Sequence, residues 1–188
     1  MKYKAIVIGT SFGGLEALKI ILPELGKEFP VPVVIVLHIG DHSNDTFINY
    51  MNSICPLVVK EAENNEEIKP GHIYFAPPNY HLLIEPDFTF SLSTEEKHNF
   101  SRPSIDILFE SAAWAYAKSL IGVILSGANS DGALGLKLIQ QFGGIAIVQN
   151  PCNATSPTMP RAALKMVGPG VNLKLEDIAR KLVELTGT

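Results

Sequence analysis

Residues 4–8 read Lys-Ala-Ile-Val-Ile, residues 9–14 read Gly-Thr-Ser-Phe-Gly-Gly, and residues 15–19 read Leu-Glu-Ala-Leu-Lys. An apolar run, a Gly-x-Ser-x-Gly turn and an amphipathic segment, in this order, predict a buried strand that turns sharply into a helix. Such a turn would expose the hydroxyl of Ser11 beyond the carboxyl end of the strand. Ser11 is therefore a candidate nucleophile, although a serine in such a turn also serves as a helix cap or in a phosphate-binding loop.

Short apolar runs recur along the chain, with helix-forming segments between them. Runs that are apolar on both faces are typical of strands in a parallel sheet covered on two sides. We therefore expect one α/β domain over residues 1–188, with a doubly wound, mostly parallel sheet and helices on both faces. Residues 81–85 and 88–92, which flank Pro86 and Asp87, predict an antiparallel β-hairpin. The strands are expected at residues 5–8, 33–37, 57–59, 73–76, 121–125 and 145–148, and the helices at residues 15–25, 45–54, 104–118, 132–142 and 176–185.

The composition argues against several classes of partner. The chain has 188 residues, of which 46% are apolar and 18% charged, and its formal net charge is −4. With no block of like charge, it offers little to attract nucleic acid or an anionic membrane. No apolar run approaches the ~20 residues that span a bilayer, and no signal-peptide pattern precedes residue 3, so we expect a cytoplasmic protein. Cys55 and Cys152 form no Cys-x-x-Cys pair and are expected to be free thiols.

Three polar residues follow predicted strands at the edge where an open parallel sheet binds its ligands. Ser11 follows the first apolar run, His38 follows residues 33–37, and Asp131 lies in the loop after residues 121–125. Hydroxyl, imidazole and carboxylate are the groups that acyl transfer needs for attack, proton relay and orientation of the imidazole. Each also has a structural interpretation. His38 could be a partly buried, hydrogen-bonded side chain at the end of a strand, and Asp131 or Ser130 could cap the following helix. Their shared edge favours a catalytic triad.

Other ligand sites fit the sequence less well. A dinucleotide fingerprint needs glycine at position 11, where this chain has Ser11. A Walker-type phosphate loop needs a lysine that residues 12–15 do not supply. A metal site built from His38, Asp41 and His42 lacks further histidines at ligand spacing, so we expect no metal and no cofactor.

Beyond these three residues, the chain resembles the catalytic domain of the CheB family, the bacterial chemotaxis protein-glutamate methylesterases, over nearly its whole length. The resemblance places the nucleophile, the base and the orienting carboxylate of the family on Ser11, His38 and Asp131. Several ordered motifs are far more specific than any one of them. The matching stretches are residues 9–14, 36–38, 71–78, 102–113, 122–127, 131–133 and 159–163.

The resemblance implies a reaction and a partner. Ser11 would attack the γ-carbonyl of a glutamate methyl ester on a cytoplasmic helix of a methyl-accepting chemotaxis receptor, and His38 would relay the proton. Deamidation of receptor glutamines is the second activity that the family implies. Backbone amides beside Ser11 would bind the oxyanion, so Phe12, Gly13 and Ala128 are expected to shape the substrate and oxyanion site.

The sequence also departs from the family. The family usually has a small residue after the serine and a methionine in the loop before the aspartate, where this chain has Phe12 and Ala128. The matched segment starts at residue 3 without a preceding receiver domain, so we expect either a constitutively open site or control by a separate regulatory protein. These departures leave two alternatives open, namely a catalytically weak binding or scaffold module and an esterase for a different substrate.

A few other residues invite a role by their type. Trp114 and Tyr116 are expected to pack against the sheet from their helix, while Tyr80 and His81 are candidates to line the cleft. Arg102 lies in a matched motif, and either a receptor carboxylate or a structural ion pair would explain it.

Overall fold

The computed structural model describes residues 2–38, 45–169 and 171–187. Its main sheet has the strand order β3-β4-β2-β1-β7-β8-β9, and every neighbouring pair in it is parallel. β5 and β6 form a separate antiparallel pair. The strands are β1 (Ala5–Thr10), β2 (Val33–Leu37), β3 (Val58–Glu61), β4 (His72–Phe75), β5 (His81–Ile84), β6 (Phe90–Ser93), β7 (Leu120–Ile124), β8 (Ile145–Gln149) and β9 (Val171–Leu173).

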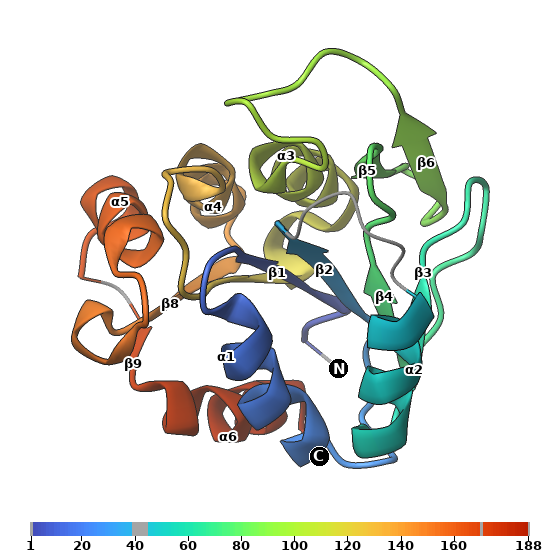
Figure 1. The fold of residues 1–188 in the computed structure, drawn as a ribbon, viewed down its shortest axis with the longest axis horizontal. Coiled ribbons are helices and arrows are strands. Elements are labelled where there is room, and N and C mark those ends of the chain that lie inside the picture. The colour runs from blue at the N-terminus through green and yellow to red at the C-terminus, as the bar shows by residue number, and fades with distance from the viewer. Residues whose placement is uncertain (1, 39–44, 170, 188) are drawn as a thin grey trace.

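Helices cover both faces of the main sheet (Figure 1). The described residues also include the short 3-10 turns η1 (Leu22–Glu24), η2 (Ala117–Ser119) and η3 (Pro151–Asn153). The sheet thus lies between two helical layers, as predicted for a doubly wound α/β domain. The helices are α1 (Gly14–Ile21), α2 (Asp45–Ile54), α3 (Ile105–Tyr116), α4 (Ala133–Gln141), α5 (Thr158–Val167) and α6 (Leu175–Thr186).

The sheet packs against each helical layer through a separate hydrophobic core. One core joins the sheet to α3, α4 and α5 through residues such as Leu108, Leu136 and Ala163. The other joins it to α1, α2 and α6 through Leu18 and Ile178 among others. Every residue of β1 and β2 is buried, which explains why these strands are apolar on both faces. The two central strands are therefore packed on both faces.

Several predicted elements differ in detail from the structure. The helix expected over residues 15–25 ends at Ile21, because Pro23 converts the last turn into the 3-10 turn η1. Helix α5 and strand β9 were not expected from the sequence. The predicted hairpin is present, but it packs on the α3 face of the core and does not join the main sheet.

The prediction that Trp114 packs against the sheet is wrong. Trp114 is 66% exposed, and its ring lies against that of Phe142 at the end of the neighbouring helix α4, with ring centroids 4.7 Å apart. Tyr116, in contrast, is buried as expected. The free thiols of Cys55 and Cys152 agree with the prediction. Among the described residues, no helix is long and apolar enough to cross a membrane.

Candidate active site

Ser11 lies in the tight turn between β1 and α1. Its backbone amide donates to the carbonyl oxygen of Ser126 at 2.9 Å, and the amide of Gly14 donates to the carbonyl oxygen of Ser11 at 2.8 Å. These two bonds fix the turn against the neighbouring strand β7 and against the start of α1. The Ser11 residue is partly exposed at this edge of the sheet, as expected for the turn.

His38 lies beside this turn because β1 and β2 are neighbouring parallel strands. Thr10 pairs with Leu37 at the end of the two strands, and the amide of His38 donates to the carbonyl oxygen of Thr10 at 3.0 Å. Ser11 and His38 therefore follow directly after a paired row of the sheet. The sequence argument that the strand ends bring these two residues to one edge agrees with this register.

The structure brings His38 and Asp131 into direct contact. Nε2 of His38 is 3.1 Å from Oδ2 of Asp131, and the side chain of Asp131 is completely buried. The distance is that of an ion pair, but the angles at the two atoms do not meet the geometry of a hydrogen bond. On the other side of the ring, Nδ1 lies 3.5 Å from Nδ2 of Asn129. Nε2 thus faces the carboxylate, and Nδ1 is the ring nitrogen that remains for another partner.

Asp131 occupies the N-terminus of α3, although it comes from the loop before α4. Its Oδ2 accepts a hydrogen bond from the amide of Ile105 at 2.7 Å. Its Oδ1 accepts from the amide of Asp106 at 3.1 Å and from the hydroxyl of Ser104 at 3.0 Å. The alternative that Asp131 simply caps its own helix is therefore wrong, because its oxygens are engaged by a helix that starts 26 residues earlier in the chain.

These contacts determine the charge of Asp131. Burial alone would raise the pKa of its carboxyl group, but His38 and the amides of Ile105 and Asp106 outweigh burial and hold the pKa below its ordinary value of 3.8. The positive end of the α3 dipole acts in the same direction. Asp131 is therefore ionised at neutral pH, and its buried negative charge faces one nitrogen of the imidazole. A carboxylate in this position can fix the tautomer and orientation of a catalytic histidine.

Two backbone amides beside Ser11 are available to an oxyanion. Within the described part of the chain, the amides of Phe12 and Gly13 have no hydrogen-bond acceptor. They precede α1, where the helix dipole favours negative charge. The turn needs Gly13 because its φ is +80°, and a Cβ atom there would lie 2.5 Å from Cβ of Thr155.

Sequence reasoning gave no role to Ser104 or Ser126, which hold this site together. The hydroxyl of Ser126 donates to the carbonyl oxygen of Phe12 at 2.8 Å and accepts from the amide of Ser156 at 2.8 Å. It therefore ties the turn that contains Ser11 to the loop after β8. Ser104 both bonds Asp131 and caps α3. Both serines lie in the motifs that carried the family resemblance, and that was the signal available in the sequence.

Two other candidates have structural positions. His81 does not line a cleft, because it is completely buried and its Nδ1 accepts a hydrogen bond from the amide of Ser104. Nη1 of Arg102 donates at 2.8 Å to the carbonyl oxygens of both Thr94 and Glu95, and so braces the loop before α3.

Metal binding finds no support in the described residues. In residues 2–38, 45–169 and 171–187, no group of three histidine, cysteine, aspartate or glutamate side chains is arranged to hold a metal ion. Asp41 and His42, which were considered with His38 as ligands, lie outside the described residues.

Residues 6–182 match the family described as CheB methylesterase. The chain belongs to this family. It is 54% identical over 185 residues to a Leptospira interrogans protein named "Putative protein-glutamate methylesterase/protein-glutamine glutaminase", and the alignment covers 98% of this chain and 96% of that protein. It is also 35% identical to the protein-glutamate methylesterase/protein-glutamine glutaminase of Archaeoglobus fulgidus, where the alignment covers 95% of this chain and 52% of the relative.

The fold of the CheB family is equally clear in the structure. The crystal structure of the Thermotoga maritima CheB methylesterase catalytic domain superposes with a TM-score of 0.93 at 34% identity, covering 98% of this chain and all of that one. The predicted family and fold class are confirmed. Like the relative from Archaeoglobus, several other relatives are about twice as long as the segment that they share with this chain.

The two departures from the family lie at the surface of the site. Phe12, next to Ser11, is 67% exposed. Ala128, in the loop between β7 and Asp131, is exposed as well. The contacts that hold the backbone of the turn come from Gly13 and from the hydroxyl of Ser126, and they involve neither of these side chains. The departures therefore change the outer surface that a substrate meets and leave the buried part of the site intact.

Proposed function

We propose that this chain is a protein-glutamate methylesterase in which Ser11 is the nucleophile, His38 the general base and Asp131 the orienting carboxylate. The observation that carries the proposal is the 3.1 Å contact between His38 and the buried, ionised Asp131. His38 follows β2, the strand that pairs with β1, and Ser11 follows β1. Nucleophile, base and orienting group in this order make up the machinery of serine hydrolases. The names of the relatives point to the same reaction.

In the acylation step, Ser11 attacks the γ-carbonyl carbon of a glutamate methyl ester. Because Nε2 of His38 faces Asp131, we assign Nδ1 as the nitrogen that accepts the hydroxyl proton. The negative charge on the tetrahedral oxygen is stabilised by the amides of Phe12 and Gly13. The imidazolium then gives its proton to the departing methoxide, so methanol leaves and an acyl-enzyme remains.

In the deacylation step, water repeats the cycle with the roles of the leaving groups changed. His38 removes a proton from the water, the resulting hydroxide attacks the acyl carbon, and the proton returns to the oxygen of Ser11. A glutamate carboxylate is released. A glutamine side chain would follow the same route with ammonia as the leaving group, which accounts for a protein-glutamine glutaminase activity. Asp131 stays ionised throughout and stabilises the imidazolium.

We infer that the substrate is carried on a cytoplasmic helix of a methyl-accepting chemotaxis receptor. The exposed position of Phe12 supports a protein substrate, since an aromatic side chain at the surface offers apolar contact area beside the reacting ester. The reaction needs no cofactor, because every step above uses only protein groups and water.

The test measures methanol release from a methylated receptor. Wild-type protein should release methanol, and Ser11→Ala should reduce the rate at least about 10³-fold. Ser130→Ala is the matched control, because Ser130 is exposed in the loop before α4 and should leave the rate unchanged. Unchanged release by Ser11→Ala would contradict the proposal. Wild-type turnover of small methyl esters without receptor turnover would assign a different ester substrate, and no turnover of either would favour a binding module.

A further inference from the structure

Helices α3 and α4 cap each other's N-termini. Asp131, just before α4, accepts from the first amides of α3. In return Asp106, in the first turn of α3, accepts at Oδ1 from the amide of Gly135 in the first turn of α4 at 2.7 Å. The N-cap residue of α4, Gly132, has no side chain to do this itself. Asp106 therefore holds the start of α4 against α3. The segment that carries Asp131 leads directly into this part of α4.

The two helices are in close contact at this point. A Cβ atom on Gly135 would lie 2.5 Å from Cβ of Phe109 and 3.1 Å from the backbone oxygen of Asp106. Close-packed interiors transmit small displacements to their neighbours, because few voids absorb them. Only three residues lie between Asp131 and Gly135. A shift of the first turn of α4 would therefore move the Asp131 carboxylate relative to His38.

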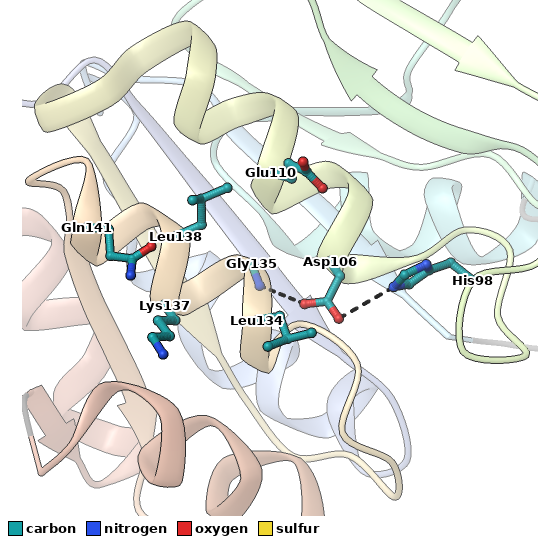
Figure 2. A pocket seen from close by; sticks show the side chains of 8 residues that line it. All are labelled: His98, Asp106, Glu110, Leu134, Gly135, Lys137, Leu138 and Gln141. Carbon is teal, nitrogen blue, oxygen red and sulfur yellow. Dashed lines mark hydrogen bonds and ion pairs between the residues drawn. The ribbon is translucent and has the colours of Figure 1, made fainter.

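Asp106, although buried, also borders a hollow in the surface. The hollow has a volume of about 350 Å³ and lies between α3 and α4. Figure 2 shows the carboxylate of Asp106 between Gly135 and His98, with a dashed line to each. Its Oδ2 lies 3.9 Å from Nε2 of His98 and 3.4 Å from Nδ2 of Asn99, while Glu110 and Lys137 supply the other charged groups of the wall. These contacts are long, so the short bond to Gly135 is the one that fixes Asp106.

We propose that Asp106 is a positioning residue of the active site, which fixes the first turn of α4 and thereby holds Asp131 against His38. The proposal rests on the function proposed above. Asp106 touches no reacting atom, and its effect on the reaction passes through Asp131 alone. A group that misplaces catalytic residues by about 1 Å can slow a reaction about 10²-fold, so removal of this one hydrogen bond is expected to be visible in the rate.

The experiment compares Asp106→Ala with Asp106→Asn. Alanine removes the acceptor for the Gly135 amide, whereas asparagine keeps an oxygen in the same place and removes the charge. Asp106→Ala should lower kcat for methyl-ester hydrolysis about 10- to 100-fold with little change in KM. Asp106→Asn should stay within about 3-fold of wild type, because the capping bond remains. Glu110→Gln is the control, since Glu110 is exposed one turn further along α3 on the same wall.

A second readout separates this proposal from the choice of substrate. The rate at which a fluorophosphonate labels Ser11 reports the reactivity of the serine without any natural ester. The labelling rate should fall in Asp106→Ala and return to near the wild-type value in Asp106→Asn. This expectation holds even if the receptor is not the substrate. Labelling of Asp106→Ala at the wild-type rate would overturn the proposal, and so would labelling of Asp106→Asn as slow as that of Asp106→Ala.

Asp106→Ala could fail to fold, and Asp106→Glu then carries the test. Glutamate keeps the charge but moves the acceptor by one methylene group, so labelling of the folded protein should slow about 3- to 30-fold. A wild-type labelling rate in folded Asp106→Glu would overturn the proposal. Folding is checked by circular dichroism before each rate is measured.

Discussion

Asp131 and Asp106 lie at the starts of neighbouring helices, both are buried, and the pKa values of their carboxyl groups move in opposite directions. Burial raises the pKa of both. At Asp131 the contact with His38 and two amides of α3 reverses the effect of burial. At Asp106 the hydrogen bond from the amide of Gly135 lowers the pKa and offsets only part of the effect of burial. The negative charge of Asp131 raises the pKa further, so that it reaches about 6. The donors around a buried carboxyl group thus decide its charge more than its depth does.

The comparison separates two tasks that look alike in the sequence. Asp131 provides a permanent negative charge beside the imidazole, as an orienting carboxylate must. Asp106 provides an acceptor for a helix amide, which a neutral oxygen can also provide. Removing the charge from each residue in turn should therefore have very different consequences.

The largest difference is expected between Asp131→Asn and Asp106→Asn in ester hydrolysis. Asp131→Asn removes the charge that faces Nε2 of His38, so kcat should fall about 10³- to 10⁴-fold. Asp106→Asn should change kcat less than about 3-fold. Steady-state kinetics on methylated receptor measure both. Equal losses in the two variants would break the distinction between the two carboxylates.

The next effect concerns stability as a function of pH. Because the folded-state pKa of Asp106 is raised from 3.8 to about 6, the folded protein binds this proton more tightly than the unfolded chain. The corresponding stability is fully present below the unfolded value and is lost as pH rises through about 6. The total loss is of the order of 3 kcal/mol. Asp131 has the opposite sign, since its lowered pKa contributes stability above 3.8 that is lost as pH falls through the folded value.

Urea unfolding at a series of pH values isolates the contribution of Asp106. The free energy of unfolding of Asp106→Asn, minus that of wild type, should rise between about pH 4 and pH 7 by up to about 3 kcal/mol. A difference that stays flat over this range would show that Asp106 titrates normally.

The smallest of these effects is expected at Ser104, which serves both sides of the comparison. Its hydroxyl donates to Asp131 and caps α3 by accepting from the amide of Ile107. Ser104→Ala should cost about 1 kcal/mol of stability, as loss of a helix cap does. It should slow hydrolysis only a few-fold, since Asp131 keeps its two amide donors. Thermal unfolding and kcat are the measurements, and a loss as large as that of Asp131→Asn would place Ser104 among the essential groups.

The sequence predicted the parts of this site that follow from strand ends. Ser11 and His38 come directly after buried apolar runs, and the parallel register places such residues side by side without further information. Asp131 was predicted by the same rule, but its contacts were not. Its donors belong to α3, and no local pattern indicates which helix N-terminus a loop carboxylate will reach. Ser104 and Asp106 lie in a motif that supports the family resemblance, but the motif does not indicate which residues they contact.

The misjudged parts of the fold have a similar cause. Trp114 is apolar and helical, yet it lies on the outer side of α3, and only the packing of α3 against α4 and the sheet determines which side faces out. Strand β9 is three residues long, and it is paired through its contact with β8 more than by its own composition. Local patterns therefore sufficed for the buried strands at the centre of the sheet, and they failed for elements such as β9, where a tertiary contact decided the outcome.

The most direct test of the account is the site and rate of covalent labelling. After reaction with a fluorophosphonate and proteolysis, mass spectrometry should find the adduct on Ser11, and His38→Ala should slow its formation at least about 10²-fold. An adduct on a different serine, or labelling of Ser11 at an unchanged rate in His38→Ala, would contradict the claim that His38 activates Ser11 at this edge of the sheet.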